Sequence, residues 1–152
     1  MKPVVVQMPI ARPVPEVFAF LEEVENNPRW LRGMESCTWT TPPPVRVGSR
    51  YEQRASFLGK QIRTSFEVTA HQQGSLVTIR SREGSSFPIT VTRQVEPLGD
   101  RGSLVTETLD SDPRGYYRVA EPLLRLLVQR RIRRDYQRLK ALLEAGSDRS
   151  AS

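Results

Sequence analysis

Apolar residues recur with helical spacing near the start of the chain. Four of them follow the i, i+3, i+4, i+7 pattern of an amphipathic helix: Val17, Phe20, Leu21 and Val24. The valine-rich residues 4–8 before this helix predict a β-strand. After it, Pro28 and Gly33 bracket a second, shorter helical turn, because proline suits the first turn of a helix and glycine its end. The chain is therefore expected to begin with one strand and two short helices.

The pattern then changes to short β-rich runs separated by turn residues such as Pro42-Pro43-Pro44 and Gln73-Gly74. Six strands are predicted, around residues 34–40, 49–57, 61–71, 75–82, 87–96 and 103–110. Short links between successive strands favour an antiparallel meander.

Helical spacing returns over residues 117–144, where one face is mostly apolar. The residues along this face are Ala120, Leu124, Val128, Ile132, Tyr136, Leu139 and Leu143. The length of 152 residues fits a single domain, which we assign to residues 1–145, and the polar residues 146–152 are expected to be a disordered tail.

The segment Val24-Glu25-Asn26-Asn27-Pro28-Arg29-Trp30 resembles the Asn-x-Pro-x-Trp segment of the SRPBCC superfamily, the START/Bet v1-like domains that include polyketide cyclase/dehydrase-like proteins. The resemblance covers nearly the whole chain. It implies an α+β helix-grip fold: a curved antiparallel seven-stranded sheet, two short helices after the first strand, and a long C-terminal helix across the concave face. It also implies a container for an apolar small molecule. Physical reasoning agrees, because the apolar face of such a sheet must be covered and only the last helix, about 40 Å long at 1.5 Å per residue, is long enough.

The formal charge of +6 is concentrated at the C-terminal end. Residues 1–112 hold 13 basic and 13 acidic side chains, whereas residues 113–152 hold 10 and 4. The basic residues of 129–138 include Arg130, Arg133, Arg134 and Arg138, which fall opposite the apolar stripe. We interpret them as a solvated helix face rather than a nucleic-acid surface, because only Tyr136 could stack on bases.

Neither a membrane span nor a signal peptide is apparent in the sequence, and the single Cys37 cannot form an internal disulfide. A soluble, cytoplasmic protein is therefore expected. Cys37 and Met34 are interpreted as packing residues.

Alternation along the strands predicts which side chains face the helix. The expected ligand-binding residues on the strands are Tyr51, Gln53, Phe57, Phe66, Ile79, Ile89, Val91, Arg93 and Glu107. On the helices we expect contributions from Trp30, Leu124, Arg125 and Val128. Trp30 is a candidate for the portal, although aromatic residues at such spacing are also ordinary core. Arg125 could face the ligand or lie at the helix edge.

Arg93 and Glu107 interrupt the inward apolar pattern and lie on strands joined by a short link, so they could be cross-strand neighbours. A lone buried charge is expensive and a paired one is tolerable. Two interpretations follow: a polar anchor for a ligand, or a structural salt bridge.

The first half of the long helix is apolar on its far face as well, with Val119, Leu123, Leu126 and Leu127. A second copy of the chain, a membrane surface or the preceding residues 111–115 could cover it.

No catalytic, metal-binding or phosphate-binding motif occurs, and no cofactor is expected. His71, the only histidine, is interpreted as a solvated turn residue. The leading hypothesis is a protein that binds an apolar or aromatic molecule between sheet and helix without catalysis. The resemblance also admits a polyketide cyclase, in which Arg93 would polarise a carbonyl and Glu107 or Tyr51 would handle protons. A lipid or quinone carrier acting at membranes is a third hypothesis.

Overall fold

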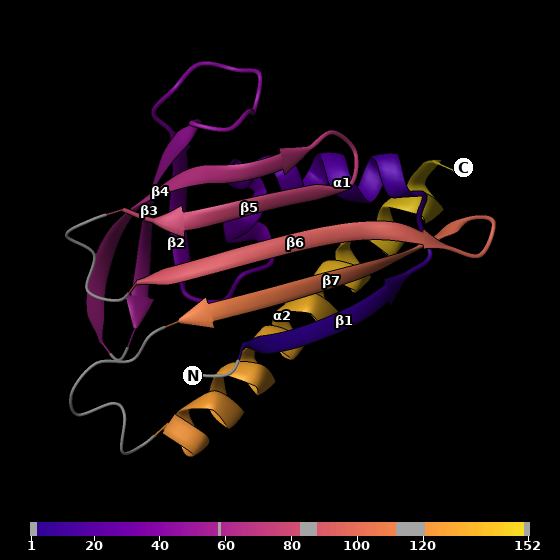
Figure 1. Cartoon of the computed structure of the whole chain (residues 1–152). Helices are drawn as coiled ribbons and strands as arrows, with labels where there is room; N and C mark the ends of the chain where they lie inside the picture. The colour runs from indigo at the N-terminus through magenta and orange to yellow at the C-terminus, as the bar shows by residue number, and fades with distance from the viewer. Residues whose placement is uncertain (1–2, 58, 83–87, 112–120, 151–152) are drawn as a thin grey trace.

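The computed structural model describes residues 3–57, 59–82, 88–111 and 121–150, with residues 57, 121 and 147–150 described by their backbone alone. Within these residues, seven strands and three helices follow in the order that the sequence predicts (Figure 1). They are β1 (Val4–Ile10), α1 (Val14–Glu22), η1 (Val24–Arg29), β2 (Met34–Trp39), β3 (Arg50–Phe57), β4 (Lys60–Gln72), β5 (Leu76–Ser81), β6 (Ile89–Leu98), β7 (Gly102–Ser111) and α2 (Glu121–Ser150).

All seven strands form one antiparallel sheet in the order β1-β7-β6-β5-β4-β3-β2. Strands β2 to β7 are a meander, as predicted, and β1 completes the sheet by pairing with β7, where Val4 lies opposite Leu109. The first strand of the chain is thus hydrogen-bonded to the last.

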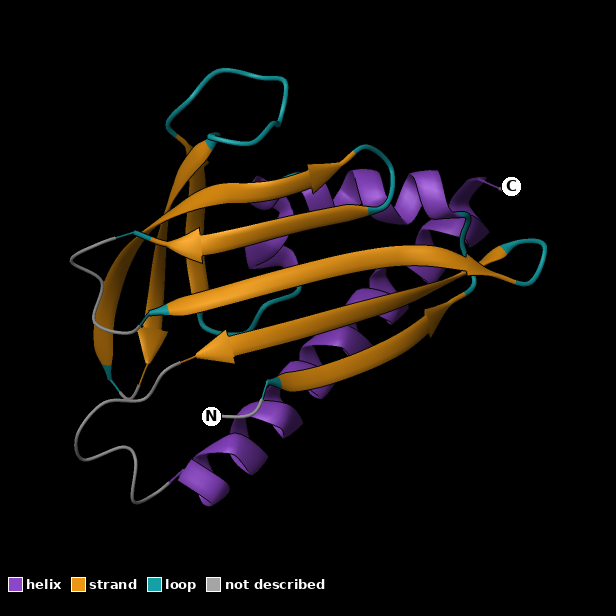
Figure 2. Cartoon of the chain, viewed as in Figure 1, coloured by secondary structure: helices purple, strands orange, loops and turns teal. Residues whose placement is uncertain are grey.

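The helices lie on one side of the curved sheet (Figure 2). The long helix α2 crosses this side diagonally and runs beside β1, while α1 packs against β6 and β7, and η1 against β2. This arrangement is the helix-grip architecture that the resemblance implies.

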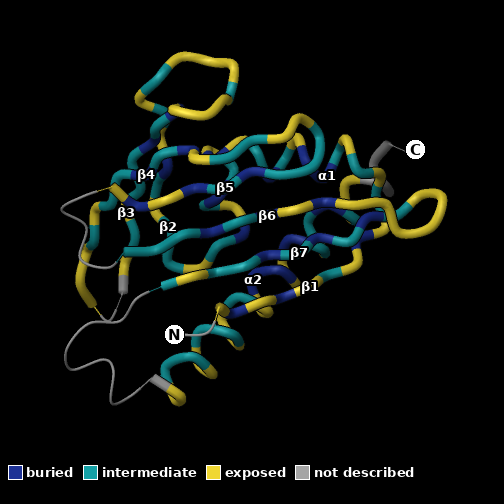
Figure 3. Tube along the Cα trace, in the orientation of Figure 1, coloured by how far each residue is buried: buried dark blue, intermediate teal, exposed yellow. Residues whose placement is uncertain are grey.

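The core fills the space between the sheet and the C-terminal half of α2 (Figure 3). On α2, Tyr136 and Leu139 are buried, whereas Leu124, Val128 and Ile132 are only partly buried. The first turns of α2 are therefore less covered than its middle.

Two helix boundaries differ from those predicted. η1 is a 3-10 helix that begins four residues before Pro28, so the proline lies inside it. The predicted helix start at 117 lies outside the described residues, and α2 continues to Ser150, past the predicted end at 144. No proline follows Leu143 to stop the helix, and a single Gly146 only weakens it.

Candidate functional site

The two charged residues predicted on the inner face form a buried pair that joins β6 and β7. Arg93 on β6 lies opposite Glu107 on β7, and its Nε donates a hydrogen bond to Oε1 of Glu107 at 3.0 Å. Tyr136 of α2 donates to the same carboxylate oxygen at 3.2 Å. These three residues are called the polar triad below. Burial alone would lower the pKa of Arg93, but the adjoining Tyr136 and Glu107 side chains outweigh this effect and raise it.

Aromatic rings surround the polar triad. The Arg93 guanidinium lies over the Trp30 ring, 5.0 Å from its centroid, and Trp30 meets Tyr136 edge to face, also at 5.0 Å. Trp30 is completely buried, so it is a core residue in this structure and does not line an opening. A cation held against an aromatic face is stabilised by the ring quadrupole, which helps to keep Arg93 charged in the core.

Tyr51 is also buried and stacks on Phe66, with 5.2 Å between ring centroids. Its hydroxyl has no hydrogen-bond partner among the described residues. Burial raises the pKa of the Tyr51 phenol well above its ordinary value. A phenol with such a pKa stays protonated at neutral pH, which makes it a poor general base.

The inner face has a closed half and an open half, and the polar triad lies at their boundary. In the closed half, Val68, Val95 and Val105 are buried beneath α1 and the C-terminal part of α2. The open half consists of partly buried residues of the strands and of α2: Gln53, Ala55, Ile62, Thr64, Ile89, Leu109, Leu124, Val128 and Ile132. Four of the predicted ligand-binding residues, Gln53, Ile89, Leu124 and Val128, belong to the open half.

The other predicted ligand-binding residues lie elsewhere. Phe66, Ile79 and Val91 are buried, and Ile79, Val91 and Arg93 line a cavity of about 10 Å³ beneath α1. This volume holds one water molecule at most. The side chain of Phe57 lies outside the described residues.

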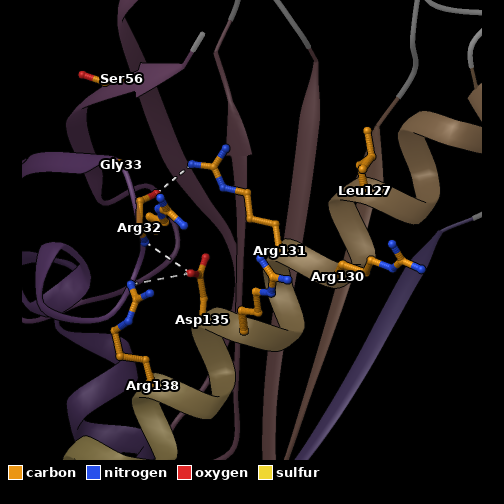
Figure 4. A pocket seen from close by; sticks show the side chains of 9 residues that line it. Arg32, Gly33, Ser56, Leu127, Arg130, Arg131, Asp135 and Arg138 are labelled. Carbon is orange, nitrogen blue, oxygen red and sulfur yellow. Dashed lines mark hydrogen bonds and ion pairs between the residues drawn. The ribbon is translucent and has the colours of Figure 1, made fainter. Parts of the chain in front are cut away.

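A much larger cleft of about 450 Å³ lies between α2 and the turn before β2 (Figure 4). It is lined by Arg32, Gly33, Ser56, Leu127, Arg130, Arg131, Arg134, Asp135 and Arg138. We call it the arginine cleft. None of the predicted ligand-binding residues lines it. The helix arginines were expected to be a solvated face, and the sequence did not indicate that several of them line a cleft.

Arg125 lies at the edge of α2. Its Nη2 donates to the backbone oxygen of Pro3 at 2.9 Å, just before β1. Of the two positions considered from the sequence, the structure shows the helix edge.

The expectation that His71 is solvated is wrong. A bulge between Val68 and Ala70 shifts the register of β4, so that His71 lies opposite the inward-facing Val77. Its side chain is 10% exposed and its Nε2 lies 3.6 Å from a carboxylate oxygen of Glu22. Strand alternation read without the bulge puts this residue on the wrong face.

Cys37 is buried, as expected for a packing residue. Burial raises the pKa of its thiol to about 11. Such a thiol is almost entirely protonated at neutral pH and is therefore a weak nucleophile.

Sequence reasoning missed Tyr136 as a partner of Glu107, and Arg32 and Asp135 as members of the cleft. Tyr136 was placed on the apolar face of the helix, but nothing in the sequence shows which strand it meets. The two cleft residues are 103 positions apart, and their contact, from the Arg32 backbone N–H to Asp135 Oδ1 at 3.3 Å, depends on the docking of α2.

In the described part of the chain, no group of three or more His, Cys, Asp and Glu side chains could hold a metal ion. Nor do the described helices include a stretch long and apolar enough to cross a bilayer.

Solved structures of similar fold cover nearly the whole chain. A protein of Thermus thermophilus shares 21% identity with a TM-score of 0.80, over 95% of this chain and 99% of that one. A START superfamily protein from Mycobacterium smegmatis shares 14% identity with a TM-score of 0.79, over 95% of this chain and 99% of that one. The Zhui aromatase/cyclase from a Streptomyces species shares 12% identity with a TM-score of 0.72, over 94% of this chain and 93% of that one. At these identities the likeness establishes the fold alone, which is that of the START-like helix-grip proteins.

A family described as polyketide cyclase/dehydrase and lipid transport matches residues 1–144. The chain belongs to this family, which confirms the resemblance seen in its sequence. A search of the curated proteins found no match.

Proposed function

We propose that this protein binds an apolar or aromatic small molecule in the open half of its inner face, between the sheet and the N-terminal half of α2. The observation that carries this proposal is the uneven cover that α2 gives the sheet. Val105 on β7 and Leu139 on the C-terminal half of α2 are fully buried. In contrast, Ile89, Leu109 and Val128 are partly accessible to solvent. Apolar side chains left partly exposed in a concave surface favour an apolar ligand.

The polar triad limits how deep such a ligand reaches. Arg93 and Glu107 are hydrogen-bonded to each other and are 8% and 6% exposed in their side chains. A ligand that approaches them would meet an ion pair already satisfied, so their first role is to hold β6, β7 and α2 together. This arrangement favours binding over the cyclase mechanism, which needs Arg93 directed at a carbonyl and Glu107 or Tyr51 exchanging protons.

Native mass spectrometry of gently purified protein is the first test, since a molecule retained in the site would appear as a reproducible adduct. Binding of the neutral apolar dye Nile red then locates the site. Val128→Trp should fill the open half and abolish dye binding, while Leu123→Trp, on the exposed face of the same helix, should leave it unchanged.

Equal dye binding by the Val128→Trp variant and the unaltered protein would overturn the proposed site. Conversion of a β-polyketone by the purified chain, lost in Glu107→Gln with the fold retained, would instead support the cyclase hypothesis.

A further inference from the structure

The arginine cleft lies on the side of α2 that faces away from β1, and it draws cations from two separate parts of the chain. Arg130, Arg131, Arg134 and Arg138 come from α2, and Arg32 comes from the turn before β2 (Figure 4). Ser56 at the end of β3 closes the far wall. The hollow is therefore formed by three elements and exists only in the folded protein.

Two of the arginines are held in place by backbone oxygens. Nη2 of Arg131 donates to the carbonyl of Arg32 at 2.7 Å, and Nη1 of Arg138 donates to the carbonyl of Trp30 at 3.3 Å. Gly33 permits this close approach, because a Cβ there would lie 2.9 Å from the Arg131 Nη2. Positioned guanidinium groups lose less entropy on binding an anion than freely moving ones.

The cleft carries a large excess of positive charge. Five arginines and a single acidic residue, Asp135, line it, which gives a formal charge of +4. Among the described residues, the guanidinium groups of Arg32, Arg130 and Arg134 make no hydrogen bond or ion pair. Like charges at i, i+4, such as Arg130 with Arg134 and Arg134 with Arg138, repel each other and destabilise a helix. A bound anion would remove this repulsion.

Phosphate fits the cleft better than a simple carboxylate. Guanidinium groups form paired hydrogen bonds with phosphate oxygens, and a dianion offsets more of the charge of +4. The volume of about 450 Å³ exceeds what an inorganic ion needs, so the phosphate would be attached to an organic body. Leu127 at the rim is 53% exposed and offers that body an apolar contact.

We propose that the arginine cleft is a second ligand site, distinct from the open half of the inner face, that binds the phosphate group of an organic phosphate. The phosphate could belong to a soluble phosphomonoester or diphosphate, or to a lipid headgroup. Leu123 and Leu126, which are 63% and 44% exposed near the rim, would in the second case contact the acyl region of a bilayer.

The test uses the full chain with two probes: inorganic pyrophosphate in isothermal titration calorimetry, and phosphatidylcholine vesicles with and without phosphatidic acid in a flotation assay. The variant Arg130→Gln/Arg134→Gln removes two cleft cations that hold nothing else in place. The control Arg80→Gln/Arg133→Gln removes the same charge from exposed positions outside the cleft.

We expect the cleft variant to bind at least about tenfold more weakly, equivalent to about 1.4 kcal/mol, and the control to change less than about twofold. Asp135→Asn should strengthen binding, because it removes the one negative charge. Pyrophosphate binding with these effects identifies a soluble phosphate as sufficient. Binding to phosphatidic acid vesicles alone, with the same effects, identifies the lipid headgroup as the source.

Failure of both probes to bind would overturn the proposal, as would an equal loss in the control variant, which would indicate general attraction by net charge. The Nile red site is independent of these arginines. Its binding should persist in the Arg130→Gln/Arg134→Gln variant, so the two proposals fail separately.

Discussion

At the residue scale, the Arg93–Glu107 pair is notable because both charges are removed from water on the inner face of β6 and β7. Breaking such a pair from one side leaves the other charge uncompensated. Glu107→Gln should therefore lower the free energy of unfolding by about 3 to 5 kcal/mol. Urea unfolding followed by circular dichroism measures this loss.

Glu52→Gln is the matched control for Glu107→Gln, because Glu52 pairs with Arg63 at 3.0 Å on the exposed face of neighbouring strands. An exposed pair contributes about 0 to 1 kcal/mol, so this change should be nearly silent. Similar losses in the two variants would show that the buried pair is not what stabilises the junction of β6 and β7.

Cys37 should react slowly with a thiol reagent in the native protein. Burial raises its pKa to about 11 and keeps Sγ from the reagent. The native pKa exceeds the ordinary value of 9.0, so the unfolded thiol releases its proton first as the pH rises. Stability is thus expected to fall between about pH 9 and 11. Comparing the rate of Ellman's reagent in buffer and in guanidinium chloride checks the protection; equal rates would contradict it.

Single residues also show what can and cannot be predicted from the sequence. Strand alternation placed Arg93 and Glu107 on the inner face correctly, because period two depends only on local geometry. His71 was interpreted as a solvated turn residue, but it lies within β4, where a bulge after Val68 turns it to the inner face and nothing local reveals that bulge. The Trp30–Arg93 contact could not be predicted, because it joins two elements through the tertiary fold.

At the element scale, the turn before β2 depends on Gly33. Its φ of +82° is rare for residues with a side chain, and an added Cβ would also lie 2.9 Å from the backbone oxygen of Ser56. Gly33→Ala should therefore cost more than the roughly 1 to 2 kcal/mol expected for the positive φ alone. Thermal unfolding of the variant measures the total.

Gly74→Ala measures the loss of stability that comes from the positive φ alone, without a steric clash. Gly74 has a similar φ of +78°, but an added Cβ there meets nothing within 4 Å. We expect a smaller loss at Gly74 than at Gly33. Equal losses would mean that the turn and Arg131 shift to accommodate the methyl group.

Strands were easier to predict than the long helix. The six strands after η1 have bounds within about two residues of those expected from turn residues and alternation. For α2, the pattern gave the buried Leu139 and Leu143. The arginine cleft was not predicted, because helical spacing shows which residues share a face but not which segment lies opposite that face.

At the scale of the whole molecule, β1 joins the N-terminal part of the chain to its C-terminal elements. It pairs with β7 over its full length and also lies against α2. Val6→Asp should unfold the protein or lower its stability by several kcal/mol, because Val6 is 1% exposed and a carboxylate there would lack a partner. Val5→Asp, one residue away on the outer face at 47% exposure, should be tolerated. Circular dichroism melting curves of the two variants compare them directly, and a folded Val6→Asp protein with an unchanged melting temperature would contradict the role of β1.

The position of Trp30 makes it an optical reporter of the core. It is completely shielded between Arg93 and Tyr136, while Trp39 is partly exposed at the end of the edge strand β2. A Trp39→Phe variant would therefore emit from Trp30 alone, at the short wavelengths of an indole removed from water and out of reach of acrylamide. A shift of that emission to longer wavelength when a ligand is added would show that α2 has moved away from the sheet. An unchanged spectrum would show that the open half receives its ligand while the closed half stays intact.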